Sequence, residues 1–137
     1  MKLYSTILIV FIISISCKSQ ENSTKTELSY VAQTRGYHLT INLKENTLEI
    51  SENNNISKKV LTNKKLAELQ KIISEIDFSK LKNNLSAENV AVDKAIPANF
   101  KLKLNEADYN FEFEHNNLPK GIENLINTLQ EFVLLKE

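Results

Sequence analysis

The stretch from Asn99 to His115, NFKLKLNEADYNFEFEH, predicts the fold more directly than any other part of the chain. Apolar side chains alternate with polar ones on both sides of a short polar run, which is the period-2 pattern of two half-buried strands joined by a loop. With Asn105–Asp108 as the loop, one register satisfies the apolar and the polar face together. The expected cross-strand pairs are Leu102 with Phe111, Phe100 with Phe113, and Lys101 with Glu112.

A second hairpin is predicted upstream, because apolar residues alternate with polar ones from Tyr37 to Leu43 and resume at Leu48. A turn over residues 44–47 would set Leu43 opposite Leu48 and Ile41 opposite Ile50. A further short strand is expected over residues 56–61, after the asparagine turn at 53–55.

Two amphipathic helices complete the pattern. Thr62 is a suitable N-cap for the first, and Pro119 suits the first turn of the second. Their apolar stripes are Leu66, Leu69, Ile72, Ile73 and Ile76 in the first, and Ile122, Leu125, Ile126, Leu129, Phe132 and Val133 in the second. The segment 82–98 between the first helix and the second hairpin is the least regular.

These elements predict an α+β fold, with an antiparallel sheet of two hairpins and two helices packed on one face of the sheet, in the order β-β-β-α-β-β-α. All the apolar stripes would then be buried together. We expect residues 29–137 to form this single domain.

The N-terminus has the order of a secretory signal. Lys2 is followed by the apolar run 7–13 and by small residues up to Cys17, the only cysteine. The apolar run is too short to span a bilayer of roughly 30 Å. Residues 1–16 are therefore predicted to be a signal peptide, and a buried thiol or a catalytic cysteine at this position is disfavoured.

Ser14-Ile15-Ser16-Cys17 resembles a bacterial lipobox, which implies that Cys17 is lipidated and becomes the N-terminus of the mature chain; plain secretory cleavage is the alternative. Residues 17–28 are then the lipidated cysteine and a polar tether, averaging under ~20 Å in length. The expected location is the bacterial cell envelope, most simply the outer membrane, with the lipid at Cys17 holding the domain to the membrane.

Composition excludes several functions. The 137 residues carry 17 Lys and Arg against 17 Asp and Glu, so no basic surplus favours nucleic acid as a partner. A single cysteine allows neither an internal disulfide nor a cysteine-rich metal cluster. The two glycines, Gly36 and Gly121, are too few and too far apart for a phosphate-binding loop. No cofactor is expected.

No catalytic or metal-binding set is assigned. Neither His38 nor His115 belongs to a metal-ligand spacing, and we expect His38 to be exposed and His115 to form a hydrogen bond across a loop or helix start. Glu112 and Glu114 share a strand face, as a glycosidase pair might, but the lysines expected across the hairpin indicate ordinary charge pairs.

One corner is a candidate partner-binding site. Arg35 precedes Gly36, which can supply a positive φ that directs the arginine side chain, and Asp93 lies in the irregular connection. Together with His115 these residues form the hypothesis of a partner-binding corner. The interpretation that we favour over this hypothesis is an Arg35–Asp93 ion pair that only holds the long loop in place.

Four segments, TRGYHLTI, NKKLAELQKIISEIDFSKL, NFKLKLNEADYNFEFEH and NLPKGIENLINTLQ, resemble a group of small uncharacterised Bacteroidetes-type lipoproteins. The order of elements is also similar to that of emfourin, a protein inhibitor of thermolysin-like metallopeptidases. We therefore expect a membrane-anchored envelope lipoprotein that binds another envelope protein, or supports envelope structure, and is not an enzyme. An emfourin-like inhibitor is the alternative, and a small hydrolase using His115 with Asp93 is the third hypothesis.

Overall fold

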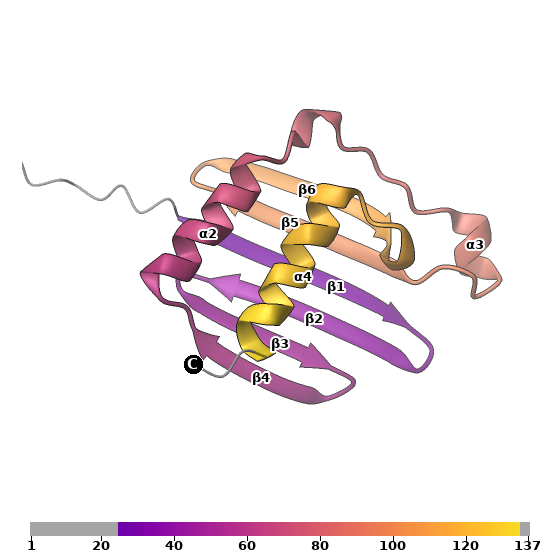
Figure 1. Ribbon diagram of the computed structural model, residues 1–137. Helices are drawn as coiled ribbons and strands as arrows, with labels where there is room; N and C mark the ends of the chain where they lie inside the picture. Colours follow the sequence, from indigo (N-terminus) through magenta and orange to yellow (C-terminus); the bar gives the residue numbers. More distant parts are fainter. Residues whose placement is uncertain (1–24, 135–137) are drawn as a thin grey trace, which may run out of the picture.

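One six-stranded antiparallel sheet carries two long helices on a single face (Figure 1). The structure is a computed structural model that describes residues 25–134. The strands, in the spatial order β4-β3-β2-β1-β5-β6, are β1 Thr26–Thr34, β2 Tyr37–Lys44, β3 Thr47–Glu52, β4 Asn55–Val60, β5 Pro97–Leu104 and β6 Ala107–Glu114. The helices are α2 Asn63–Ser74, α3 Ala87–Ala91 and α4 Lys120–Leu134, with short 3₁₀ turns η1 Phe78–Lys80 and η2 His115–Asn117. The predicted α+β class and the packing of helices against one face are confirmed.

The central strand β1 was not predicted. It lies between β2 and β5 and pairs antiparallel with both. Because it starts at Thr26, Thr26–Leu28 belong to the domain and not to the tether. Leu28, Tyr30 and Ala32 of this strand are its buried apolar residues, and Thr26, at the same strand parity, is buried as well. Its other face carries polar residues and Val31, and the backbone of the strand is paired on both edges.

The register of the β5–β6 hairpin differs by two residues from the prediction. The turn contains only Asn105 and Glu106, because Leu104 pairs with Ala107. Asn105 adopts a φ of 53°, which asparagine tolerates and which two-residue hairpin turns require. The resulting pairs are Phe100 with Phe111, Leu102 with Tyr109, Ala98 with Phe113 and Lys101 with Asn110. A shift of two residues keeps each side chain on its predicted face, so the apolar face survives while the predicted partners change.

The other predicted elements are present, with two differences in their bounds: Lys44 pairs with Thr47, so the β2–β3 turn contains two residues instead of four, and β4 covers residues 55–60 instead of 56–61. In the β2–β3 hairpin Ile41 pairs with Ile50 and Leu43 with Leu48. Thr62 caps α2, where its Oγ1 accepts a hydrogen bond from the backbone N–H of Lys65 at 3.4 Å. The predicted stripes of α2 and α4 supply Leu69 and Ile73, and Ile122, Leu125, Ile126, Leu129 and Phe132, to the core. Burying each large apolar side chain contributes roughly 1.5–3 kcal/mol.

The connection between α2 and β5 runs along the outer edge of β6. The backbone N–H groups of Glu112 and Glu114 donate to the side-chain oxygens of Asn83 (3.0 Å) and Asn84 (2.9 Å). The N–H of Asn84 in turn donates to the Glu112 carbonyl at 3.1 Å, and its side-chain amide to the Asn117 carbonyl at 2.7 Å. This irregular segment therefore acts as a substitute strand partner for β6.

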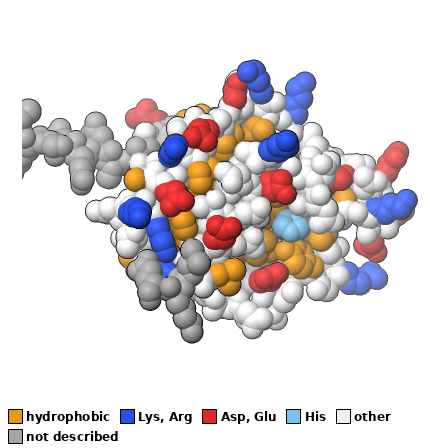
Figure 2. All heavy atoms as spheres, in the orientation of Figure 1, with side chains coloured by type: hydrophobic (Ala, Val, Ile, Leu, Met, Phe, Trp, Pro, Cys, Tyr) orange, Lys and Arg blue, Asp and Glu red, His pale blue; other side chains and the backbone are white. Residues whose placement is uncertain are grey.

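The two faces of the sheet differ. On the side of the helices, acidic and basic side chains are interspersed and do not gather by sign (Figure 2). On the other face, strands carry mainly polar side chains such as Ser29 and Asn42, whose hydrogen bond measures 2.9 Å. Within residues 25–134 no helix has the length and apolarity to cross a bilayer. The predicted signal peptide, Cys17 and most of the tether lie outside the described residues.

Candidate functional site

The most distinctive polar cluster joins His115 to two tyrosines that are far away in the sequence. Tyr30 comes from the middle of β1 and Tyr37 from the start of β2. His115 is the first residue of η2, directly after β6, and its backbone N–H donates to the Ile96 carbonyl at 2.8 Å. The Tyr30 hydroxyl lies 2.6 Å from His115 Nδ1, and the Tyr37 hydroxyl lies 3.2 Å from Nε2. We refer to these three residues as the Tyr–His–Tyr cluster.

Burial shapes the chemistry of this cluster. Tyr30 is 0% exposed, and desolvation raises the pKa of its hydroxyl far above the ordinary value, with a further contribution from Tyr37. Burial also raises the pKa of Tyr37, and the negative charge of Glu52 adds to that shift. For His115, burial lowers the pKa, while Glu52 acts in the opposite direction. At neutral pH the cluster therefore contains a neutral imidazole and two protonated tyrosines.

Both ring nitrogens of His115 are engaged. A neutral imidazole has one donor and one acceptor nitrogen, so one tyrosine hydroxyl donates to the ring and the other accepts from it. A general base needs a ring nitrogen directed at the proton that it removes, and a metal ligand needs a free lone pair. In this arrangement the two tyrosines occupy both positions, and the ring ties the end of β6 to β1 and β2.

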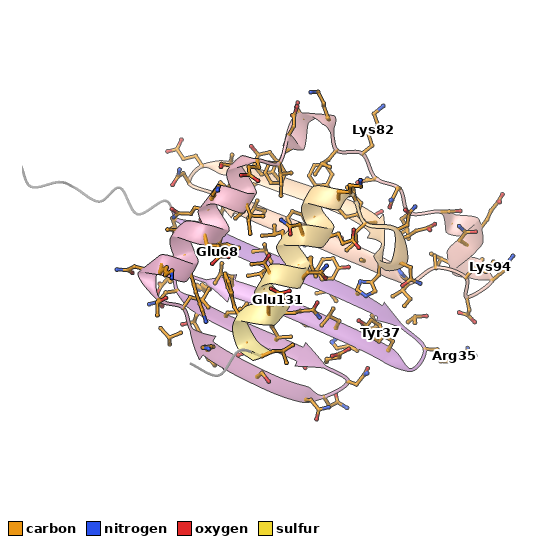
Figure 3. All side chains as sticks on the ribbon, in the orientation of Figure 1. Arg35, Tyr37, Glu68, Lys82, Lys94 and Glu131 are labelled. Carbon is orange, nitrogen blue, oxygen red and sulfur yellow. The ribbon has the colours of Figure 1, made fainter. Side chains whose placement is uncertain are left out.

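The predicted corner of Arg35, Asp93 and His115 is only partly assembled. All three come from segments at the end of the sheet opposite Thr26. Arg35 lies at the tip of the β1–β2 turn, beyond Tyr37 (Figure 3). Gly36 has the expected positive φ, 85°. Asp93 is exposed after α3 and has a φ of 54°. No Arg35–Asp93 ion pair is present in the described part of the chain, and the ring of His115 is bonded to the tyrosines.

Tyr30 and Tyr37 are the site residues that sequence reasoning missed. Tyr30 stands between Leu28 and Ala32 in an alternating pattern that signals a strand, but nothing in the sequence pairs that strand with β5. His115 does form hydrogen bonds across elements, as expected, although its partners are strand tyrosines. His38 is partly buried, and its Nε2 lies 2.9 Å from the Thr40 hydroxyl.

The two strand glutamates do not pair with the lysines across the hairpin. Glu112 lies opposite Asn99 and Glu114 opposite Pro97, because of the two-residue turn. The Glu114 carboxylate accepts hydrogen bonds from the backbone N–H of Ser86 at 3.3 Å and the side-chain amide of Asn89 at 3.0 Å. Glu114 therefore holds α3 against β6. Among residues 25–134 no group of three or more His, Cys, Asp or Glu side chains could hold a metal ion.

Comparison with known proteins finds no family model that matches the chain and no curated protein similar to it.

The pKa shifts in the Tyr–His–Tyr cluster predict that the free energy of unfolding is highest around neutral pH and decreases toward both acid and alkaline pH. Because the folded pKa of His115 lies below that of the unfolded chain, the unfolded state takes up a proton first, and stability falls as the pH drops below about 6.5. Because the folded pKa of Tyr30 is raised, stability falls as the pH rises above about 10. One proton changes the free energy of unfolding by at most ~1.4 kcal/mol per pH unit, and the partial exposure of His115 reduces its slope.

Urea unfolding between about pH 5.5 and 11 measures this profile. The Tyr30→Phe variant should lose most of the alkaline decline and keep the acid decline. A wild-type profile that is flat from pH 5.5 to 7 would contradict the proposed environment of His115.

Proposed function

We propose that this chain is a lipid-anchored envelope protein whose α+β domain binds another protein and does not catalyse a reaction. The observation that carries the proposal is the engagement of both His115 nitrogens by Tyr30 and Tyr37. This arrangement uses the one histidine of the candidate corner to connect strands, which suits a rigid binding module.

The position of the corner also favours this proposal. The chain enters the domain at Thr26, and the β1–β2 turn with Arg35 lies at the opposite end of the sheet (Figure 1). Nine residues of β1 span ~30 Å at about 3.3 Å per residue. A lipid at Cys17 would thus place Arg35 and Asp93 on the side of the domain that faces away from the membrane.

Cross-linking in intact membranes tests the proposal. The full chain, carrying a photo-cross-linker near Arg35, should form a reproducible adduct with a specific envelope protein, and Arg35→Glu should reduce that adduct at least severalfold. Lys82→Glu is the matched control, because Lys82 is an exposed cation on the connection above β6 (Figure 3). Purified thermolysin-type metallopeptidase is added in a separate arm, since the element order is similar to that of emfourin.

Three results would overturn the proposal. The first is the absence of any adduct beyond those of an unrelated lipid-anchored protein. The second is an adduct that Arg35→Glu and Lys82→Glu reduce equally. The third is turnover of a substrate by the purified full chain that His115→Ala abolishes.

A further inference from the structure

The two edges of the sheet are treated differently by the fold. The sheet ends at β6 on one side and at β4 on the other. The Asn83–Asn84 segment bonds to the outer edge of β6. At β4 we find no equivalent: among residues 25–134, the backbone groups of Ile56, Lys58 and Val60 make no hydrogen bond to an element beyond β3. Among residues 25–134 no segment covers the edge of β4, and an edge of this kind can accept a strand from another chain.

The strand register identifies the backbone groups of β4 that do not bond to β3. The β3–β4 turn contains Asn53 and Asn54, so Glu52 and Asn55 flank a two-residue turn. In such a hairpin the flanking residues form a hydrogen-bonded pair, and the pattern alternates from there. Ile56, Lys58 and Val60 therefore direct their N–H and C=O groups away from β3, toward the position of a seventh strand.

The side chains of these three residues lie on the same face of the sheet, and two of them, Ile56 and Val60, are apolar. Ile56 is 69% exposed and Val60 is 62% exposed, whereas their neighbours across β3, Ser51 and Thr47, are polar. Lys58 lies between them, with its ammonium 3.6 Å from the Glu49 carboxylate. The edge thus presents an apolar–cationic–apolar series at alternate positions, next to open backbone groups.

We propose that β4 binds an extended segment of another protein by strand addition, and that this segment carries an acidic residue between two apolar ones at alternate positions. The inference names the partner chemistry for the proposed binding function, and it rests on that function. Main-chain hydrogen bonds to Ile56, Lys58 and Val60 supply affinity. The cross-strand contacts to the two apolar side chains and to the lysine supply selectivity.

Two other occupants fit less well. A second copy of β4, paired antiparallel so that Ile56 faces Val60 of its partner, would set Lys58 directly opposite the partner's Lys58, and like charges directly opposite are destabilising. The tether residues 18–25, KSQENSTK, contain no apolar side chain to place against Ile56 or Val60. The charge and the apolar spacing of the edge therefore favour a foreign acidic strand.

Two synthetic peptides test this inference on the full chain in mild detergent. Ac-TVTETVT-NH2 has the proposed pattern, and Ac-TVTKTVT-NH2 replaces its acidic residue with lysine. We expect the acidic peptide to bind roughly fivefold more tightly, which corresponds to about 1 kcal/mol for opposite against like charge across a strand pair. Its binding should slow amide hydrogen exchange at Ile56, Lys58 and Val60.

Variants at the edge provide the decisive comparison. Lys58→Glu should reverse the preference between the two peptides, and Lys58→Gln, which creates no repulsion with Glu49, should abolish it. Lys101→Glu is the matched control, because Lys101 is an exposed lysine on the same face but belongs to the inner strand β5. Far-ultraviolet circular dichroism checks that each variant is folded.

The inference would be overturned if both peptides bind equally, if exchange at the three amides is unchanged, or if sedimentation shows dimerisation through β4. These outcomes are separable from failure of the proposed function. A specific membrane adduct that Lys58→Glu leaves intact would overturn strand addition and retain partner binding. Peptide binding without any membrane adduct would retain strand addition and overturn the role assigned to the Arg35 corner.

Discussion

Replacing His115 with alanine is expected to lower the free energy of unfolding by roughly 2–4 kcal/mol. The Tyr30 hydroxyl is fully buried, and its bond to His115 Nδ1 measures 2.6 Å. Removing one partner of a buried hydrogen bond costs about 1–3 kcal/mol, and loss of the Tyr37 bond to Nε2 adds about 1 kcal/mol. Urea or guanidinium unfolding of the full chain measures the change.

His38→Ala is the matched control for this substitution. His38 lies on the open face, and its Nε2 bonds to Thr40, a residue of the same strand. Its replacement should change the free energy of unfolding by no more than about 0.5 kcal/mol. Equal effects of the two alanine substitutions would contradict the structural role of the cluster.

A double-mutant cycle separates the hydrogen bond from general packing. Tyr30→Phe removes the buried hydroxyl, so His115→Ala in that background no longer leaves it without a partner. The cost of His115→Ala should therefore be smaller by about 1–2 kcal/mol in the Tyr30→Phe background. Strictly additive effects would show that the two side chains contribute independently.

Replacing Cys17 with alanine is expected to transfer the protein from the membrane to the soluble fraction. Each acyl CH₂ group buried in the bilayer contributes ~0.8 kcal/mol, so a diacyl or triacyl anchor dominates membrane binding and its loss changes partitioning by orders of magnitude. Membrane fractionation, incorporation of labelled fatty acid and the intact mass of the mature chain measure the effect together.

Ser19→Ala is the control for the anchor, since Ser19 follows the cysteine and carries no predicted lipid. It should leave fractionation, labelling and mass unchanged, apart from the mass of one oxygen atom. Membrane association that survives Cys17→Ala, or a mature chain that never incorporates fatty acid, would contradict the lipobox interpretation. This result would leave the fold and the Tyr–His–Tyr cluster unaffected.

The sequence predicted much of the fold because local periodicity carries it. Alternation in FKLKL and YNFEF separates the buried face from the exposed face without knowledge of any partner strand. The stripes of α2 and α4 are readable for the same reason, and Thr62 marks the start of α2 through its side-chain oxygen. These features depend on residues within one or two turns of each other.

The sequence was a poorer guide to turns and to β1. The backbone dihedral of Asn105 decides between a two-residue and a four-residue turn, and both choices keep the same side chains in the core. Strand β1 bonds to β2 and β5 along both edges, so its placement depends on residues of β5 some seventy positions further along the chain. Local patterns contain no such information.

The sequence by itself determined the targeting prediction at Cys17, the class of the fold and which face of most strands is buried. Each of these depends on a contiguous run of residues. Only the tertiary structure brought His115 between Tyr30 and Tyr37. It also left β4 without a further partner among residues 25–134, while β6 is bonded to Asn83 and Asn84. Both arrangements arise from the order of strands in the sheet. That order is set by packing and hydrogen bonds between segments distant in sequence, and such contacts have no local signature.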